Sequence, residues 1–502
     1  MILSIDQGTT GTTVLIFNLN GNVLSKAYNE FTQIYPQPSW VEHDAEEIWQ
    51  ITLKTIEVAL ELASLKASEL TAIGITNQRE TTVLWDKSTG KPIHNAIVWQ
   101  CRRSADICER IKSDGKESWI REKTGLVVDA YFSATKIKWL MENCENAQQL
   151  VREDKLAFGT IDTWLIWKLT GGESHVTDHT NASRTMLYNI KTQKWDKELL
   201  DYFEFKATIL PAIQNSASHF GYTSPDKFFG ARVSITGVAG DQQSALFGHQ
   251  CTQLGQVKNT YGTGCFLLMY IGENLKSFES EPTDDKSNPS GLLTTIACDQ
   301  NGAPAYALEG SIFNAGSAIQ WLRDELGLIE SAGETEAIAA SISDSKGVYL
   351  VPAFTGLGAP YWDMQARGTI TGLTRGSGKK EIIRATLESL AYQTRDVVNL
   401  MEEVSGISVS KLQVDGGACQ NNFLMQFQSD ILETQIHRPK QIESTAIGAA
   451  LLAGIGAKVW EADNLPDTLL EKDAVFVSKM TSEVREQSVT GWNKAIRQTR
   501  QG

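Results

Sequence analysis

One stretch near the start of the chain decides the fold class: Ile2-Leu3-Ser4-Ile5-Asp6-Gln7-Gly8-Thr9-Thr10-Gly11. Residues 2–6 predict a first strand, and the Gly/Thr run that follows predicts a tight turn bounded by glycines. A second strand is expected over residues 12–18. Asn20-Gly21 is a strong signal for a two-residue hairpin, so a third strand should begin at Val23. The chain therefore opens with three strands joined by two tight turns.

A helix and another strand are predicted after these hairpins. Asp44 stands three residues ahead of Glu47, which resembles a capping box with Asp44 as the N-cap of a helix through residues 48–62. Residues 72–76 predict the next apolar strand. Strands that alternate with helices indicate an α/β architecture with a largely buried sheet.

The middle of the chain repeats the opening pattern. Tyr261-Gly262-Thr263-Gly264 is a second glycine–threonine turn, and strand-like residues 257–260 and 266–269 flank it. Gly8 and Gly262 are 254 positions apart in a chain of 502 residues, so one such hairpin opens each half. Self-similarity of this kind is typical of a chain built from two related units.

Two short hairpins can also match by coincidence, and the later segments argue against that alternative. A long amphipathic helix is predicted across residues 383–404 and a strand across 411–414, so the second half has α/β content of its own. We expect two similar domains, residues 1–250 and 251–502, that share a tight interface with a hinge. The stretch 277–290, with charged side chains and two prolines, predicts a polar surface loop.

Composition excludes several classes of function. Forty-six basic against sixty acidic side chains leave a formal charge of −14, which argues against nucleic-acid binding and against a polybasic membrane surface. The seven cysteines form no C-x-x-C pair, so neither a zinc knuckle nor a disulfide framework is expected. No signal peptide is visible, and the uncharged run 444–457 is shorter than the roughly 20 residues that span a bilayer. We expect a cytoplasmic protein without membrane insertion.

The first hairpin has the composition of a phosphate-binding loop. Glycines let backbone N–H groups approach an anion, and the hydroxyls of Thr9 and Thr10 add hydrogen-bond donors. Asp6, at the end of the preceding strand, is well placed to hold a hydrated Mg²⁺ on those phosphates. The alternative is an ordinary hairpin turn. The chain has no G-x-x-x-x-G-K-[ST] motif, which excludes a P-loop NTPase, and no G-x-G-x-x-G after its first strand.

A second nucleotide-type motif follows the predicted strand 411–414. Asp415-Gly416-Gly417-Ala418 comes next, and Asn421 opens a helix. Two glycines allow a flat ring to lie against the backbone, and the Asn421 amide can form hydrogen bonds with it. A tight strand-to-helix turn without a ligand is the alternative interpretation.

Two further polar motifs follow predicted strands. Gln78-Arg79-Glu80 should lie at the carboxyl end of a sheet, where ligands bind in open α/β folds, although such a triplet is also common as a surface ion pair. Gly240-Asp241-Gln242-Gln243 opens a helix. Asp241 can accept a proton from a hydroxyl that attacks a γ-phosphate, or it can be a simple N-cap.

Taken together, these motifs resemble the FGGY family of carbohydrate kinases, and in particular its members that phosphorylate glycerol. They occur in the family's order and cover nearly the whole chain: residues 5–10, 77–81, 99–103, 240–243, 260–264, 352–362, 415–422 and 423–430. The resemblance implies two ribonuclease-H-like, actin-like ATPase domains with a nucleotide cleft between them. It also implies transfer of a phosphoryl group from ATP to glycerol, giving sn-glycerol 3-phosphate and ADP with Mg²⁺, as the first step of glycerol catabolism. Members of the family commonly form homodimers or homotetramers.

The resemblance also assigns roles to individual residues. Glycerol would be held through its hydroxyls by Arg79, Glu80, Tyr131, Asp241 and Gln242, and Trp99 and Phe266 would cover its carbon face. Asp241 would be the general base, and Asp6 would organise the metal. The nucleotide would be bound by Thr9, Thr10, Gly11, Thr13, Thr263, Gly316, Gln320, Gly417 and Asn421.

The phosphate-binding hairpin departs from the family pattern at two positions. Gly11 and Thr13 stand where the family usually has Ser and Arg. Without the guanidinium group, Thr13 offers only a neutral hydrogen bond to a phosphate. We expect catalysis to survive through Mg²⁺ and backbone donors, and nucleotide affinity or regulation to differ.

Two alternatives remain at this point. The first is an FGGY kinase for a pentulose or another sugar. The second is a catalytically silent actin-like protein, against which the joint presence of Asp6, Arg79, Glu80 and Asp241 argues.

Overall fold

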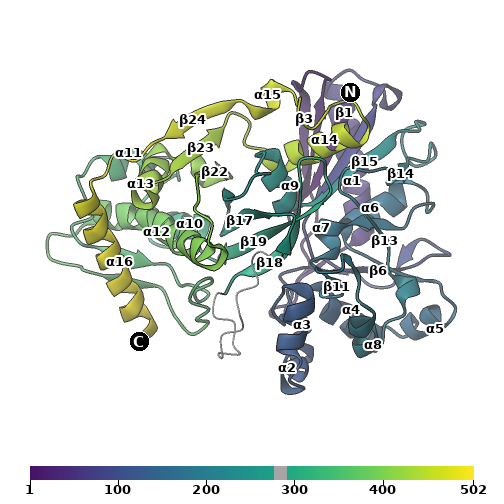
Figure 1. Cartoon of the computed structure of the whole chain (residues 1–502), viewed down its shortest axis with the longest axis horizontal. Coiled ribbons are helices and arrows are strands. Elements are labelled where there is room, and N and C mark those ends of the chain that lie inside the picture. Colours follow the sequence, from purple (N-terminus) through teal and green to yellow (C-terminus); the bar gives the residue numbers. More distant parts are fainter. Residues whose placement is uncertain (276–290, 502) are drawn as a thin grey trace.

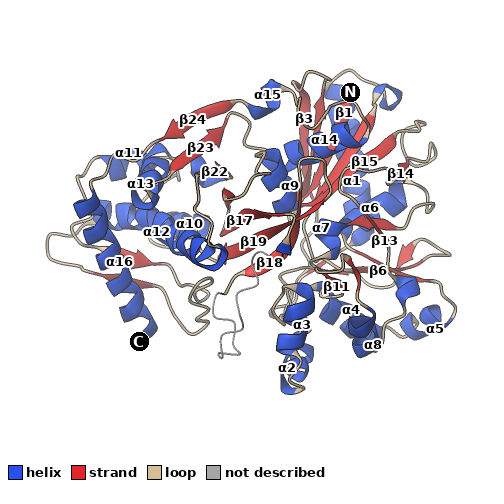
Figure 2. Ribbon diagram, in the orientation of Figure 1, coloured by secondary structure: helices blue, strands red, loops and turns tan. Residues whose placement is uncertain are grey.

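The structure is a computed structural model that describes residues 1–275 and 291–501. The whole of the segment 277–290 that the sequence predicts as a polar loop therefore lies outside the described residues. The chain forms two halves, each built around a central β-sheet flanked by helices (Figures 1 and 2).

The sheet of the N-terminal half has six strands in the order β14-β15-β5-β1-β2-β3. Its strands are β1 (Ile2–Gln7), β2 (Gly11–Phe17), β3 (Val23–Glu30), β5 (Ala72–Asn77), β14 (Gly221–Tyr222) and β15 (Ser234–Gly240). The three strands predicted at the start of the chain are therefore confirmed. β1 is antiparallel to β2 and parallel to β5, which in turn is parallel to β15.

The sheet of the C-terminal half has seven strands in the order β18-β19-β17-β16-β22-β23-β24. They are β16 (Gln256–Tyr261), β17 (Cys265–Gly272), β18 (Leu293–Cys298), β19 (Pro304–Ile312), β22 (Lys411–Asp415), β23 (Gln435–Pro439) and β24 (Lys472–Phe476). β16 is antiparallel to β17 and parallel to β22, as β1 is to β2 and β5. The repeated arrangement confirms the predicted α/β fold, in which the second hairpin repeats the first.

Helices cover these sheets and fill the space between the smaller strands. The longer ones are α1 (Ala45–Leu62), α2 (Ala105–Ser113), α4 (Ser133–Asn143), α6 (Ile161–Leu169), α10 (Gly316–Asp324), α12 (Lys379–Ser405), α13 (Asn422–Leu432), α14 (Ser444–Gly456) and α16 (Ser482–Gln501). The shorter ones are α3 (Glu117–Thr124), α5 (Ala147–Arg152), α7 (His179–Ala182), α8 (Lys197–Phe203), α9 (Asp241–Gly248), α11 (Glu334–Ala340) and α15 (Asp467–Leu470).

Short strands outside the two central sheets extend the N-terminal half and brace α12. They are β4 (Glu42–His43), β6 (Val83–Asp86), β7 (Lys91–Pro92), β8 (Ala96–Ile97), β9 (Leu156–Gly159), β10 (Val176–Asp178), β11 (Tyr188–Asn189), β12 (Lys194–Trp195), β13 (Ala212–Gln214), β20 (Tyr349–Val351) and β21 (Thr369–Thr371).

Helix α1 begins as the sequence predicts, with one difference. Asp44 is its N-cap, and its Oδ1 accepts hydrogen bonds from the backbone N–H groups of Glu46 and Glu47 at 2.8 and 3.3 Å. The predicted capping box is wrong, because the Glu47 carboxylate does not return to Asp44. Glu47 Oε1 instead accepts from the backbone N–H and the hydroxyl of Thr32, at 3.1 and 2.9 Å. This contact ties α1 to the end of the first sheet.

Helix α14 joins the two halves, because it comes late in the chain yet packs on β1, β5, β15 and α9 of the N-terminal half (Figure 1). Glycines permit the close approach: a Cβ atom at Gly448 would lie 1.8 Å from the carbonyl oxygen of Ser244. The Thr236 hydroxyl donates to the Ala453 carbonyl at 2.8 Å. This buried helix is the uncharged run 444–457. Within the described ranges, no helix combines the length and apolar character that a membrane span requires.

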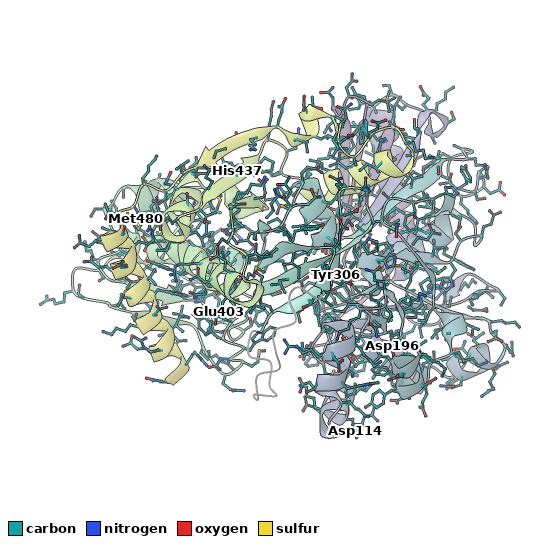
Figure 3. All side chains as sticks on the ribbon, viewed as in Figure 1. Asp114, Asp196, Tyr306, Glu403, His437 and Met480 are labelled. Atoms are coloured by element: carbon teal, nitrogen blue, oxygen red, sulfur yellow. The ribbon has the colours of Figure 1, made fainter. Side chains whose placement is uncertain are left out.

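The halves also meet at β19. Tyr306, labelled in Figure 3, lies on this strand, and its hydroxyl donates to the carbonyl oxygen of Ile190 at 2.8 Å. Further contacts of this kind, described below, connect the two halves at the candidate site.

Candidate active site

Three parallel strands of the first sheet end at the same level. Gln7, the last residue of β1, pairs with Asn77 at the end of β5, and Asn77 pairs with Gly240 at the end of β15. The segments that follow these strands therefore start side by side: the Gly8 turn, Gln78-Arg79-Glu80 and Asp241-Gln242. The expectation that Gln78-Arg79-Glu80 lies at the carboxyl end of the sheet is confirmed.

Arg79 is the centre of a buried network of charges. Its Nε lies 3.1 Å from Oδ1 of Asp241, and its Nη1 and Nη2 donate to the two carboxylate oxygens of Glu309 at 2.6 and 3.1 Å. The side chains of Arg79 and Glu80 are only 2% and 1% exposed, so the interpretation of this triplet as a surface ion pair is wrong. Glu80 adopts a left-handed backbone conformation with φ of 61°. Such a conformation is costly for a non-glycine residue and is concentrated at functional sites.

Sequence reasoning missed two members of this network, Arg184 and Glu309. Arg184 Nε donates to Glu80 Oε1 at 2.6 Å, and Arg184 Nη2 donates to Glu309 Oε1 at 3.0 Å. Burial by itself would raise the pKa of Glu309, but Arg184 and Arg79 lower that pKa to about 2. The available signal was a lone acidic residue in the apolar strand Pro304–Ile312, since an unpaired charge is rarely buried.

Asp241 is the first residue of α9, and the N-cap of that helix is Gly240. The interpretation of Asp241 as an N-cap is therefore wrong. Its side chain is 30% exposed, and its Oδ1 accepts from the backbone N–H of Gln242 at 2.7 Å as well as facing Arg79. Among the described residues, Oδ2 has no hydrogen-bond partner. One carboxylate oxygen is thus held in place while the other is open to a ligand.

Three aromatic side chains were expected around the acceptor. The Trp99 indole N–H donates to the Thr9 hydroxyl at 2.9 Å, and its ring contacts the Tyr131 ring edge-on at a centroid distance of 5.6 Å. The Tyr131 hydroxyl accepts from Arg79 Nη2 at 3.4 Å. Phe266 lies on β17 in register with Thr260 and is half-buried. Trp99 and Tyr131 are thus linked to both the phosphate hairpin and Arg79.

Asp6 has the electrostatics of a cation site. Burial, and then the charge of Asp241, raise the pKa of Asp6 to about 8. Two carboxylates that oppose each other in this way are stabilised by a divalent cation, so the donor set fits the predicted Mg²⁺. No cluster of three or more His, Cys, Asp or Glu side chains suited to a metal occurs in the described part of the chain.

Each glycine–threonine turn is closed by a backbone hydrogen bond from its first glycine, and the second turn is one residue shorter than the first. The Gly8 N–H donates to the Gly11 carbonyl and the Gly262 N–H to the Gly264 carbonyl, each at 2.9 Å. At Gly11, a Cβ atom would lie 2.6 Å from the Tyr28 hydroxyl. The glycine found where the family usually has Ser thus makes room for Tyr28. Thr13, the other position that differs from the family pattern, lies opposite Asp6 in the register of β1 and β2.

A cavity of 490 Å³ opens beside the second turn. It is lined by five of the residues predicted to bind the nucleotide: Thr263, Gly316, Gln320, Gly417 and Asn421. Arg323, Thr335 and Glu336 also line it and were not predicted, because nothing in their local sequence distinguishes them from ordinary helix-end residues. The remaining predicted nucleotide residues, Thr9, Thr10, Gly11 and Thr13, belong to the first turn and the strand after it.

The second nucleotide motif forms one wall of this cavity. Gly416 has φ of 82°, and a Cβ atom there would lie 2.5 Å from the Tyr261 carbonyl oxygen, whereas nothing lies within 4 Å of a Cβ atom at Gly417. Gly417 therefore leaves open space where a ring can lie. Asn421 is the N-cap of α13, as predicted: its Oδ1 accepts from the Leu424 N–H, and its Nδ2 donates to Thr335.

Comparison with known proteins identifies the family. The sequence profile for the N-terminal domain of the FGGY family of carbohydrate kinases matches residues 1–248, and the profile for its C-terminal domain matches residues 257–457. The chain belongs to the FGGY family of carbohydrate kinases.

Full-length relatives of this FGGY-family chain carry more specific names. It is 56% identical to a glycerol kinase of Petrotoga mobilis and 54% identical to glycerol kinase 2 of Thermotoga maritima, each over 99% of this chain and 98% of the relative. A crystal structure of Plasmodium falciparum glycerol kinase with ADP superposes with a TM-score of 0.90 at 38% identity, covering 99% of this chain and 98% of that one. The resemblance inferred from the motifs is therefore confirmed.

Proposed function

We propose that this protein transfers the γ-phosphoryl group of ATP to glycerol, giving sn-glycerol 3-phosphate and ADP. Relatives named glycerol kinase, at 54–56% identity over almost the whole chain, support the substrate. The observation that carries the proposal is the pair of Arg79 and Asp241, which follow parallel strands; Arg79 is buried, and the Asp241 side chain is 30% exposed. A carboxylate beside a buried cation in such a position suits deprotonation of an alcohol.

In this proposal, glycerol is bound by donors and acceptors of the charge network. Arg79, Tyr131 and Gln242 donate to its hydroxyls, and Glu80 accepts from them. Trp99 and Phe266 cover the carbon face, where an apolar surface favours a polyol over water. Because Arg79 and Glu80 are already held by Glu309 and Arg184, they lose little freedom when the substrate binds.

Asp241 then acts as the general base. Its Oδ1 is fixed by Arg79 and by the Gln242 N–H, so Oδ2 can face the attacking hydroxyl and take its proton as the bond to phosphorus forms. Thr263, Gly316, Gln320, Gly417 and Asn421 bind the nucleotide in the 490 Å³ cavity, and Thr9, Thr10, Gly11 and Thr13 face its phosphates.

Asp6 would hold Mg²⁺, which, when bound, neutralises the charge that develops on the transferred phosphoryl group. Support comes from the raised pKa of Asp6, whose ionised form needs a nearby cation. Water competes with glycerol as a nucleophile, so closure of the two halves about α14 would exclude it once glycerol is bound.

We also propose that the enzyme works in the cytoplasm and forms a homodimer or homotetramer. Its reaction would be the first step of glycerol catabolism. Seven unpaired cysteines, mostly buried, support a reducing compartment. Light scattering coupled to size exclusion measures the assembly, and a monomeric mass would contradict this part of the proposal.

The test is turnover of MgATP by the purified protein with glycerol, xylulose, gluconate or no acceptor, followed by ADP release and by ³¹P NMR of the product. We expect glycerol to give the highest kcat/KM and a single phosphomonoester. A sugar preferred over glycerol would make the protein another FGGY kinase, and nucleotide-dependent assembly without turnover would make it a silent relative.

A further inference from the structure

Lys258 is a buried lysine that the mechanism above does not use. It lies on β16 with its side chain fully enclosed. Its ammonium group donates to Oε1 of Gln242 and, at 2.9 Å, to the hydroxyl of Thr260. Among the described residues it forms no ion pair with a carboxylate. Burying a charge on neutral partners alone is costly, so the position of this ammonium group calls for a reason.

The electric field around Lys258 is acidic on balance. Asp415, Asp241 and Glu309 attract the ammonium group without touching it, and Arg79 repels it. Burial is the larger influence, and it lowers the pKa of Lys258 to about 8. The charges of Asp241 and of Asp415, the last residue of β22 before Gly416-Gly417, therefore both act on this lysine.

The hydrogen bond to Gln242 determines how that carboxamide is oriented. An ammonium group has only donors, so it selects the carbonyl oxygen of the amide and turns the NH₂ group away. Gln242 is half-buried beside Asp241, and its Nε2 has no hydrogen-bond partner among the described residues. Lys258 thus leaves a pair of free N–H donors next to the open oxygen of Asp241.

The same ammonium group connects the two halves of the molecule. Gln242 belongs to α9, which directly follows strand β15 of the N-terminal sheet. Lys258 and Thr260 lie on β16 of the C-terminal sheet. Thr260 is followed directly by Tyr261, Gly262 and Thr263, which line the nucleotide cavity. The Lys258 side chain therefore contacts both Gln242, which is predicted to bind glycerol, and the strand that leads into the phosphate-binding turn.

We propose that Lys258 is a positioning residue: it fixes the Gln242 amide so that Nε2 donates to a hydroxyl of the acceptor, and it aligns that amide with the nucleotide turn. This inference rests on the proposed function, because the acceptor it positions is glycerol. Without the ammonium group, the amide can rotate and present its oxygen, which cannot donate to a hydroxyl oxygen.

The test compares Lys258→Met, Gln242→Ala and the double variant with the unmodified protein, using steady-state kinetics with glycerol and MgATP. Methionine has a similar length and no charge to bury, so we expect Lys258→Met to fold with a Tm at or above that of the unmodified protein. We expect kcat/KM for glycerol to fall by roughly tenfold or more in each single variant, since a substrate hydroxyl loses its donor.

The double variant separates positioning from a general structural role. If Lys258 acts through Gln242, the double variant loses no more than Gln242→Ala alone, whereas independent effects multiply. Lys168→Met is the matched control: this lysine donates to both carboxylate oxygens of Glu46, at 2.9 and 2.7 Å, and its loss should leave the kinetics unchanged.

Three results would overturn the inference. They are normal glycerol kinetics in Lys258→Met, multiplicative losses in the double variant, and a lowered Tm that accounts for the lost activity. These are distinct from failure of the proposed function, in which the unmodified protein itself does not phosphorylate glycerol and the inference falls with it.

Discussion

Arg79 Nε lies 3.1 Å from Oδ1 of Asp241, while the other end of the same guanidinium group forms two hydrogen bonds to Glu309. Arg79 and Asp241 follow strands of the first sheet, and Glu309 lies on β19 of the second. The orientation of the proposed base is therefore set by a residue of the opposite half. A change in the relative position of the halves would move Arg79 and, with it, the environment of Asp241.

Removing the negative charge of Asp241 should affect the chemical step. We expect Asp241→Asn to lower kcat by roughly three to four powers of ten, because the attacking hydroxyl loses its proton acceptor, while glycerol binding changes little. Asp196→Asn is the control, since Asp196, labelled in Figure 3, accepts from Lys123 and Asn189 and is not among the predicted site residues. Steady-state kinetics and equilibrium glycerol binding measure both. A loss confined to KM would argue against Asp241 as the base.

A methyl group at Gly417 should act on the nucleotide alone. No atom lies within 4 Å of a Cβ atom there, so Gly417→Ala should fold with an unchanged Tm. Because the methyl group enters the 490 Å³ cavity, we expect KM for ATP to rise by about tenfold while KM for glycerol stays constant. Equal changes in both KM values would place the nucleotide elsewhere.

A methyl group at Gly448 should act on stability. Its Cβ atom would lie 1.8 Å from the carbonyl oxygen and 2.6 Å from the carbonyl carbon of Ser244, and this backbone of α9 cannot turn aside as a flexible side chain could. We expect Gly448→Ala to reduce the free energy of unfolding by at least about 2 kcal/mol. Gly376→Ala, in an exposed loop with its nearest atom 3.7 Å away, is the control and should change stability by less than about 0.5 kcal/mol. Equal stabilities in chemical denaturation would show that α14 does not pack tightly.

Gly11 and Tyr28 should be coupled. A side chain at position 11 would meet the Tyr28 ring and hydroxyl at 2.6 Å, so Gly11→Ser alone should lower both Tm and kcat/KM for ATP. Adding Tyr28→Ala removes the ring and the hydroxyl but leaves the Asn29 carbonyl oxygen 2.7 Å from the Cβ atom, so it should restore both quantities in part. A double variant no better than Gly11→Ser would mean that the backbone of the hairpin itself, rather than Tyr28, requires glycine.

Acid should destabilise the protein partly through His43. Burial lowers the pKa of this imidazole to about 4, below the value of about 6.5 expected in the unfolded chain. The unfolded state then binds more protons, so the stabilising contribution is complete above about pH 6.5 and is lost as pH falls toward about 4. We expect His43→Gln to make the decrease in unfolding free energy between about pH 7 and pH 5 shallower, by up to roughly 2 kcal/mol. Urea denaturation at each pH gives the unfolding free energy. If it decreases with pH equally in the variant and the unmodified protein, His43 is not a buried, neutral imidazole.

Much of the site could be predicted because its motifs are local. The Gly8 and Gly262 turns, the segment after β5 and the start of α9 are each short runs whose turn chemistry and position after a strand can be recognised without knowing the fold. Parallel strands bring their carboxyl ends together, so motifs that follow such strands converge. Arg79 and Asp241, 162 positions apart, were each predicted to follow a strand, and the resemblance to the family assigned both to one site.

The supporting residues could not be predicted in the same way. Glu309 is 230 positions from Arg79, and Arg184 is 104 positions from Glu80, and each is a single charged residue without a motif around it. Lys258 has the same character within an ordinary strand. The periodicity of apolar residues indicates which face of a helix or strand is buried. It does not identify the distant charged residue that will pair with a buried charge.

The amino-acid sequence by itself determined the two hairpins, the alternation of strands and helices, and the residues that follow the central strands, because backbone propensity and turn geometry act over a few neighbouring residues. Tertiary structure alone decided that Arg79, Arg184 and Lys258 are buried beside Glu80, Glu309 and Gln242, and that Tyr28 occupies the space above Gly11. The physical reason is that a buried charge is tolerated only when folding brings its partners to it, and those partners come from strands far apart in the chain.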